Sequence, residues 1–272
     1  MNRREFLLSS GCACLTAKIG TVWAATPTPK PYRCGTPPPT PSEDIQANRV
    51  IGALREHRVT FRGKTLIPVR FHIIHVGAQG YLPHRRLKAQ LELLNRVYEP
   101  SGIVFKIAEA RLHENKAWFR HEPGSHAEIA MKAELGKDTA RTLNIYTAEP
   151  SGGLSGYATF PWSHAASPER DGIVIHHASL PDAPRSDRPW PLEPGMEAVH
   201  QIGHWAAGFD HASQDGCEVP GGDAESSGGG CVMPFTPAQY QRIKEMVGYY
   251  RPELSPLTRR STLLAQVRRS VE

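Results

Sequence analysis

The sequence lacks three features that would place it in a broad class at once: a long apolar run, a strong charge bias and an internal repeat. No segment reaches the roughly 18 consecutive apolar residues of a membrane-spanning helix. The formal net charge is only +5 in 272 residues, too small to argue for a nucleic-acid-binding protein. No stretch recurs at the period of a repeat architecture. These absences favour a globular protein whose function must be read from individual residues.

Residues 1–25 have the pattern of an export signal. Arg3 and Arg4 precede an apolar run that begins at Phe6, as in twin-arginine signals, and small residues at 24–25 suit a cleavage site. A cytoplasmic basic N-terminus and a lipoprotein signal ending at Cys12 are the alternatives. Removing 1–25 takes away three cations and one anion, which lowers the formal charge from +5 to +3. We therefore expect a periplasmic or extracellular mature protein that does not span a membrane.

The chain after residue 42 predicts one α/β or α+β domain of about 200 residues. Strands are expected where β-branched or aromatic runs end at Gly, Pro or Asn, near 66–75, 103–108, 142–147, 156–160 and 172–176. Helices are expected near 83–99, 125–135, 194–207 and 236–248. Pro194 and Gly195 suit the start of the third helix, and Gly208 suits its end.

Two histidines on that third helix give the clearest chemical signal. His200 and His204 are four residues apart, so their side chains share one helix face and can bind one metal ion. In zinc peptidases of this pattern a glutamate follows the first histidine and takes a proton from metal-bound water. Here Gln201 has that position, and an amide does not accept a proton near neutral pH. The pattern therefore predicts metal binding together with lost or weakened turnover.

The stretch 200–211 resembles the zinc motif of the metzincins, in which a glycine ends the helix and a third histidine follows three residues later. Gly208 and His211 have this spacing. From His204 to His211 there is one residue more than in the family, so Asp210 is the alternative third ligand. Within the metzincins the chain resembles the pappalysin-like peptidases, which are related to pregnancy-associated plasma protein A. The similar segments are 66–75, 87–105, 143–147, 154–162, 171–175 and 235–239.

This resemblance implies a twisted, mixed five-stranded sheet with an active-site helix and a C-terminal helix in a domain spanning 66–250. It further implies a bound zinc ion and a peptide or protein substrate. The substrate would add as a strand along an edge strand, which consists of Gly156, Tyr157, Ala158, Thr159 and Phe160.

The loop after the third ligand is where the resemblance is least complete. Family members have a turn there whose methionine lies beneath the metal and whose tyrosine follows two residues later. Met233 fits that methionine in one alignment, which leaves Phe235 without the hydroxyl; in a second alignment the turn is deleted. Cys217 and Cys231 lie in this Gly-rich loop and are expected to form a disulfide.

Cys34 lies outside the domain, in a segment from 26 to 42 with seven prolines that is expected to be extended and unpacked. Arg33-Cys34-Gly35 resembles the cysteine switch of metzincin zymogens, in which a prosegment thiolate fills the open coordination position of the metal. An unpaired linker thiol is the alternative. If the switch is present, 26–65 is a prosegment, and its candidate maturation sites are Arg55, Arg58 and Arg62.

Residues 251–272 are rich in arginine and are expected to be a solvated tail, as opposed to a membrane-binding or partner-binding helix. Four functions remain open. The chain is a zinc peptidase impaired by Gln201, a non-catalytic peptide-binding relative, an active peptidase in which Glu197 replaces the missing base, or a relic without metal.

Overall fold

The computed structural model describes residues 34–183, 193–209, 235–254 and 262–271. The five strands are β1 (Thr65–His75), β2 (Ile103–Glu114), β3 (Leu143–Ala148), β4 (Gly156–Ala158) and β5 (Ile173–His176). The helices are α1 (Pro41–Glu56), α2 (His84–Tyr98), α3 (Lys116–Phe119), α4 (His126–Leu135), α5 (Met196–Ala207), α6 (Pro237–Tyr250) and α8 (Thr262–Val271), with short 3-10 turns between them.

The strands form one mixed sheet in the order β2-β1-β3-β5-β4. Four neighbouring strands run parallel, and β4 pairs antiparallel with β5 along one edge, with Gly156 opposite Ile175 and Ala158 opposite Ile173. The other side of β4 faces away from the sheet. The expected fold class and all five expected strands are thereby confirmed.

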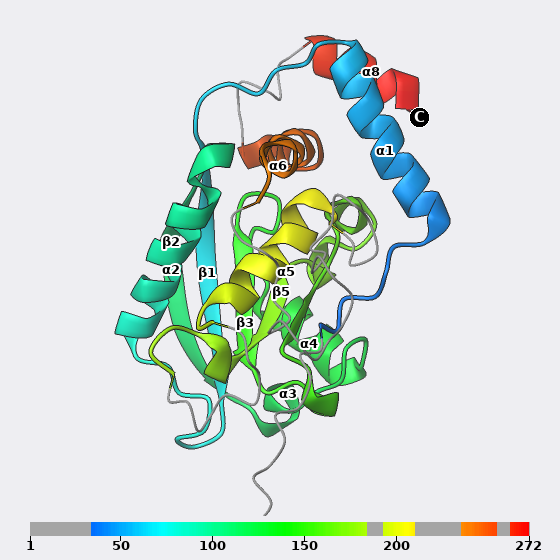
Figure 1. Cartoon of the computed structure of the whole chain (residues 1–272). Helices are drawn as coiled ribbons and strands as arrows, with labels where there is room; N and C mark the ends of the chain where they lie inside the picture. Colours follow the sequence, from blue (N-terminus) through cyan, green and yellow to red (C-terminus); the bar gives the residue numbers. More distant parts are fainter. Residues whose placement is uncertain (1–33, 184–192, 210–234, 255–261, 272) are drawn as a thin grey trace, which may run out of the picture.

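Helices cover both faces of the sheet, because successive side chains of each strand point to opposite faces. Ile73 packs in the main core with residues of α2, α5 and α6, whereas its neighbour Ile74 packs in a second cluster with Met131 of α4 and Phe119 of α3. In Figure 1, α5 and α2 lie on the same side of the sheet, and α3 and α4 lie near the end of the strands opposite α6. The helix with the two histidines is therefore held against the centre of the largest core.

The segment 26–42 was expected to be extended and unpacked; its described part is extended from Cys34 to Thr40, but its start is packed against the domain and its last two residues begin a helix. α1 begins at Pro41, where a proline is tolerated because the first turn needs no backbone donor. Thr40 and Glu43 form a capping box that stabilises this start. Cys34, Gly35 and Thr36, just before the helix, are not a free linker, since Thr36 is only 5% exposed.

The C-terminal residues are also packed, where a solvated tail was expected. Leu264, Val267 and Val271 of α8 are buried in one cluster with Val50 and Leu54 of α1. Figure 1 shows the two helices side by side at one end of the molecule, next to α6. The apolar side of α8 therefore covers an apolar side of α1, while its arginines lie on the outside or at the rim.

Arg251, the first residue of the expected solvated tail, is also buried. Its guanidinium is buried and pairs with the buried carboxylate of Asp171 at 2.8 Å. The same guanidinium lies 3.8 Å from the ring centre of Trp205 in α5, and Trp205 Nε1 donates to Asp171. Arg251 is thus part of the core that fixes α5.

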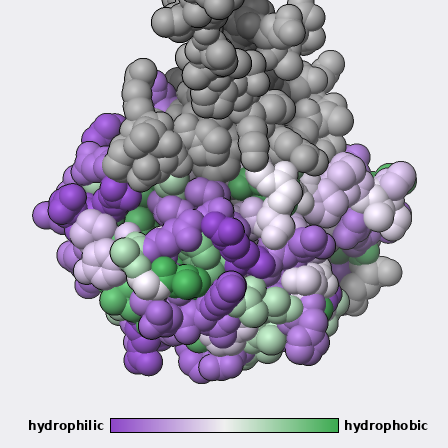
Figure 2. Space-filling model, turned by 90° about the horizontal axis from the view of Figure 1, so that it is seen from below, coloured by the Kyte–Doolittle hydropathy of each residue, from purple (hydrophilic) through white to green (hydrophobic). Residues whose placement is uncertain are grey.

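The face of the molecule in Figure 2 is mostly hydrophilic where it is not grey, with hydrophobic residues in small scattered areas. None of the helices in the described ranges is long and apolar enough to cross a membrane.

Candidate metal centre

The helix α5 ends where the sequence predicted. Gly208 follows its last residue with φ +62°, and its N–H donates to the carbonyl of His204. A Cβ at Gly208 would lie 2.2 Å from the ring of Trp162, so only glycine fits both the backbone and the space. This tight end positions Phe209, whose carbonyl accepts from His204 Nδ1 at 2.6 Å.

The two imidazoles converge as predicted. Nε2 of His200 and Nε2 of His204 are 3.0 Å apart, and both rings are buried. Since Nδ1 of His204 donates to a carbonyl, the proton is on that nitrogen and the lone pair of Nε2 points to the shared space. Two ring nitrogens at this separation form a good pair of ligands for one cation.

Cys34 supplies a third metal-type group at the same point. Its Sγ is 3.6 Å from His204 Nε2, and the ligand atoms of Cys34, His200 and His204 all lie within 4.8 Å of one another. Tetrahedral zinc, with bonds of about 2.0 Å to nitrogen and about 2.3 Å to sulfur, separates two nitrogens by about 3.3 Å and a nitrogen and a sulfur by about 3.6 Å. The residues therefore fit a zinc ion.

Burial raises the pKa of the Cys34 thiol to about 11, and the nearby carboxylate of Glu197 acts in the same direction. Hydrogen bonds from Thr36 and Gln201 to the sulfur oppose this rise. Without a metal, Cys34 is therefore a neutral thiol. A bound metal ion would bind the thiolate and displace its proton.

The segment around Cys34 runs along the outer edge of β4 as an added strand. Cys34 pairs parallel with Gly156, and Gly35 N donates to Gly156 O at 2.8 Å. Ala158 N donates to Thr36 Oγ1 at 2.9 Å. The expected substrate edge is thus covered by residues 34–36 of the same chain. Of the five expected edge residues, only 156–158 are in the strand.

Gln201 joins the helix to this segment through both ends of its amide. Its Nε2 donates to Glu197 Oε1 at 2.7 Å and to Cys34 Sγ at 3.2 Å. Its Oε1 accepts from Thr36 Oγ1 at 3.0 Å. The side chain is fully buried, so these partners fix the orientation of the amide. Gln201 and Glu197 therefore both lie beside the sulfur of Cys34.

Phe160 lies just beyond β4, with its ring stacked on Trp162 and edge-on to His204. The remaining predicted site residues, Asp210, His211, Cys217, Cys231 and Met233, fall outside the described residues. Sequence reasoning missed Thr36, because nothing in its local pattern indicates a contact with a residue 165 positions away.

A second group of metal-type side chains lies where β3 and β5 end. Glu149, His176 and His177 have ligand atoms within 4.8 Å of one another. Nδ1 of His176 already accepts from Ala178 N, so that lone pair is used to cap a turn. This makes the group a poorer set of ligands than the one on α5.

No protein-family model matches the chain. It is 31% identical over 224 residues to an extracellular metalloprotease of Verticillium alfalfae, an alignment that covers 78% of this chain and 72% of the relative. It is 30% identical over 273 residues to an extracellular metalloprotease of Uncinocarpus reesii, covering 87% and 96% of the two chains.

Among solved structures, the fold is similar to that of a Tannerella forsythia promirolysin mutant, with a TM-score of 0.63, 19% identity and coverage of 84% of this chain and 99% of that one. Mirolysin in complex with compound 9 gives a TM-score of 0.56 at 21% identity, covering 72% and 98%. At this identity the likeness concerns the fold. The sequence matches over more than two thirds of both chains establish that the protein belongs to the extracellular metalloprotease family.

Proposed function

We propose that the chain is an exported, zinc-binding, pappalysin-type member of this family whose peptidase activity is absent or very weak. The observation that carries the proposal is the position of Gln201. Its amide lies beside the candidate metal ligands and donates a hydrogen bond to Glu197. A general base in the same position would have to accept a proton instead. Loss of a positioned base lowers the rate by roughly 10² to 10⁴.

His200 and His204 are the proposed zinc ligands, with His211, or alternatively Asp210, as the third. When bound, zinc supplies a Lewis acid that lowers the pKa of a coordinated water. Cys34 would occupy the fourth position in the latent form, and the distances of 3.0 Å and 3.6 Å support this arrangement. Residues 26 to about 65 then serve as a prosegment.

The outer edge of β4 is the proposed peptide-binding site. Strand addition needs only backbone donors and acceptors, which Gly156 O and Ala158 N supply. Both are used by the segment 34–36 in the structure. A non-catalytic peptide-binding protein needs nothing more than this edge. Export is supported by the twin-arginine pattern at 1–25 and by relatives that are named extracellular.

Glu197 supports a second candidate function, an active peptidase with a substitute base. Its carboxylate is 1% exposed, lies 2.7 Å from Gln201 Nε2, and is close enough to Cys34 for its charge to raise the pKa of the thiol. Substitution Glu197→Ala should then abolish any proteolysis by the unaltered chain. If the unaltered chain cleaves no substrate, this candidate is excluded.

The deciding experiment measures zinc stoichiometry and the digestion of a peptide library. Two forms are compared, one with Gln201 and one with the substitution Gln201→Glu. Both carry Cys34→Ser, so that the N-terminal thiol does not block the metal. We expect one zinc per chain in both forms and cleavage only after Gln201→Glu. The matched control is Gln239→Glu, which makes the same chemical change at a helix cap where glutamate serves equally well.

Vigorous cleavage without the Gln201→Glu change would refute the proposed impairment. Chains free of zinc would refute the metal site and leave the histidines as buried core residues.

A further inference from the structure

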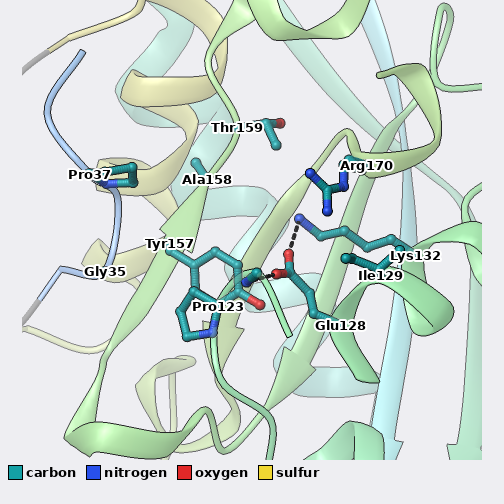
Figure 3. Close-up of a pocket in the computed structure, with 11 residues that line it drawn as sticks. Gly35, Pro37, Pro123, Glu128, Ile129, Lys132, Tyr157, Ala158, Thr159 and Arg170 are labelled. Atoms are coloured by element: carbon teal, nitrogen blue, oxygen red, sulfur yellow. Dashed lines mark hydrogen bonds and ion pairs between the residues drawn. The ribbon is translucent and has the colours of Figure 1, made fainter. Parts of the chain in front are cut away.

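A cavity of about 450 Å³ lies beside β4, on the face of the sheet opposite α5. Figure 3 shows it between the edge strand, the helix that carries Glu128 and Lys132, and the side chain of Arg170. Gly35 and Pro37 of the added N-terminal strand form part of its wall. The cavity is therefore next to the edge where a peptide would bind, but it does not belong to the metal centre.

The added strand places alternate residues on opposite faces. Cys34 and Thr36 point to α5, where they contact His204 and Gln201. Gly35, between them, is on the other face: a Cβ built on it would lie 3.4 Å from Tyr157 Cβ and 2.7 Å from the movable end of Leu154. Gly35 thus lines the cavity without a side chain, and the cavity is left unfilled beside it.

Two buried charges inside the cavity neutralise each other. Lys132 Nζ and Glu128 Oε1 are 2.8 Å apart, with side-chain exposures of 2% and 10%. Gly124 N donates to the second carboxylate oxygen at 2.6 Å, and the lysine lies 5.3 Å from the ring centre of Tyr157. The carboxylate of Glu128 is therefore fully engaged and offers little to an incoming cation.

Arg170 adds an unbalanced positive charge at the rim. It is exposed at the end of a short 3-10 turn, Pro168–Arg170, and within the described ranges it takes part in none of the ion pairs. Figure 3 shows its guanidinium on the same side of the cavity as the ammonium of Lys132. A guanidinium can bind a carboxylate through two parallel hydrogen bonds.

We propose that this cavity is a subsite for an acidic side chain of a peptide that adds along β4, with Arg170 as the residue that recognises it. The proposal rests on the proposed peptide-binding edge and names its specificity. A cavity of about 450 Å³ is large enough for any natural side chain. Charge, not size, therefore decides the preference, and a lysine or arginine would meet two cations for one engaged anion.

The N-terminal segment itself provides the test, because residue 35 already faces the cavity. We would compare Gly35→Glu, Gly35→Gln and Gly35→Lys in the full chain, in a chelating buffer without metal. All three add the same Cβ and a long side chain, so the steric effect cancels. The measurement is the alkylation rate of Cys34, located by peptide mass, since a docked segment protects this thiol.

We expect Cys34 to react about two- to fivefold more slowly with Glu at position 35 than with Lys, and Gln to lie between them, as for one partly exposed ion pair. Arg170→Gln should remove the difference. Equal rates for the three forms, or a difference that persists after Arg170→Gln, would overturn the proposal.

If a side chain at position 35 undocks the segment in all three forms, the edge becomes accessible to peptides in trans. Labelled peptides of the sequence 34–40 with Glu or Lys at the second position are then titrated into the Gly35→Lys chain. The Glu peptide should bind more tightly, and a preference for the Lys peptide would again overturn the proposal. Neither measurement uses zinc or catalysis, so failure here is distinct from failure of the proposed metal site.

Discussion

Gln201 differs from glutamate only in having an NH₂ group where the acid has an oxygen, and its neighbours depend on that difference. Its Nε2 serves two acceptors, Glu197 Oε1 and Cys34 Sγ. A glutamate would place one carboxylate oxygen against another at 2.7 Å, which forces the pair to share a proton. The amide therefore stabilises the docked N-terminal segment as well as removing a base.

Substituting Gln201→Glu should accordingly loosen the segment before any chemistry is considered. Losing the donor to Cys34 and placing a second carboxyl group against Glu197 should raise the Cys34 alkylation rate by roughly tenfold, equivalent to 1–2 kcal/mol. The second substitution Glu197→Gln should restore part of the protection, because it returns a donor to the contact between positions 197 and 201 but not to Cys34 Sγ. An unchanged rate in Gln201→Glu would mean that the amide does not hold the segment.

Gly208 allows a second test at the level of one residue. With φ +62° and Trp162 only 2.2 Å from the position of a Cβ, Gly208→Ala should lower the free energy of unfolding by about 1–3 kcal/mol and weaken zinc binding. Urea unfolding and metal titration measure the two effects. Gly52→Ala, on the exposed side of α1 with open space around it, should instead stabilise by about 0.5–1 kcal/mol.

At the level of elements, one buried ion pair connects β5, α5 and the end of α6. Asp171 and Arg251 are 0% and 1% exposed, and both contact Trp205 on the histidine helix. Arg251→Met would leave a buried carboxylate without its cation and should cost about 3–5 kcal/mol. Thermal or urea unfolding checks this. Arg141→Met, which removes an exposed pair with Glu253, should cost no more than about 1 kcal/mol.

Helices and strands with clear local signals, such as an apolar run or a terminal glycine, were predictable from the sequence. Those that depend on contacts with residues far away in the chain were not. The ends of α5 follow from Gly195 and Gly208, and β1 follows from its apolar run. β2 continues to Glu114, beyond the expected 108, because pairing with β1 holds residues whose composition is polar. α8 has an apolar side formed by Leu264, Val267 and Val271, but the sequence does not show that α1 covers it.

The same division holds for the candidate site. His200 and His204 were predicted from spacing alone and do converge. Cys34 was predicted from a three-residue resemblance, but its approach to the histidines depends on Gly35 and Thr36 pairing with β4, which no local pattern reveals. Arg170 and Lys132 were likewise missed, since one lies on a turn and the other is buried on α4.

For the whole molecule, buried histidines predict acid sensitivity. Burial lowers the pKa of His72 to about 4, against the raising effect of its bond to Asn144. In the unfolded chain the pKa is about 6.5, so below that pH the unfolded state binds more protons. The contribution of neutral His72 to the free energy of unfolding is therefore fully present above pH 6.5. The free energy of unfolding should fall by about 2–3 kcal/mol as the pH is lowered to 4.

His72→Phe tests this, because it keeps the stacking on Tyr146 while Asn144 Oδ1 retains a bond from Lys137 N. Urea unfolding between pH 4 and 7 should give a flatter profile for this variant. His84→Phe, at an exposed position, should leave the profile as in the unaltered chain. A His72→Phe profile as steep as the original would contradict the prediction.

The pairing of α1 with α8 has a consequence for any cut in the prosegment between α1 and β1. Arg58 and Arg62 are exposed in the connection 57–64, whereas α1 before it is fastened to α8 by buried side chains and by Gln46 Nε2 to Val271 O. A protease that nicks this connection would sever the chain without separating its pieces. Denaturing gels should then show two fragments that co-elute as one particle in gel filtration.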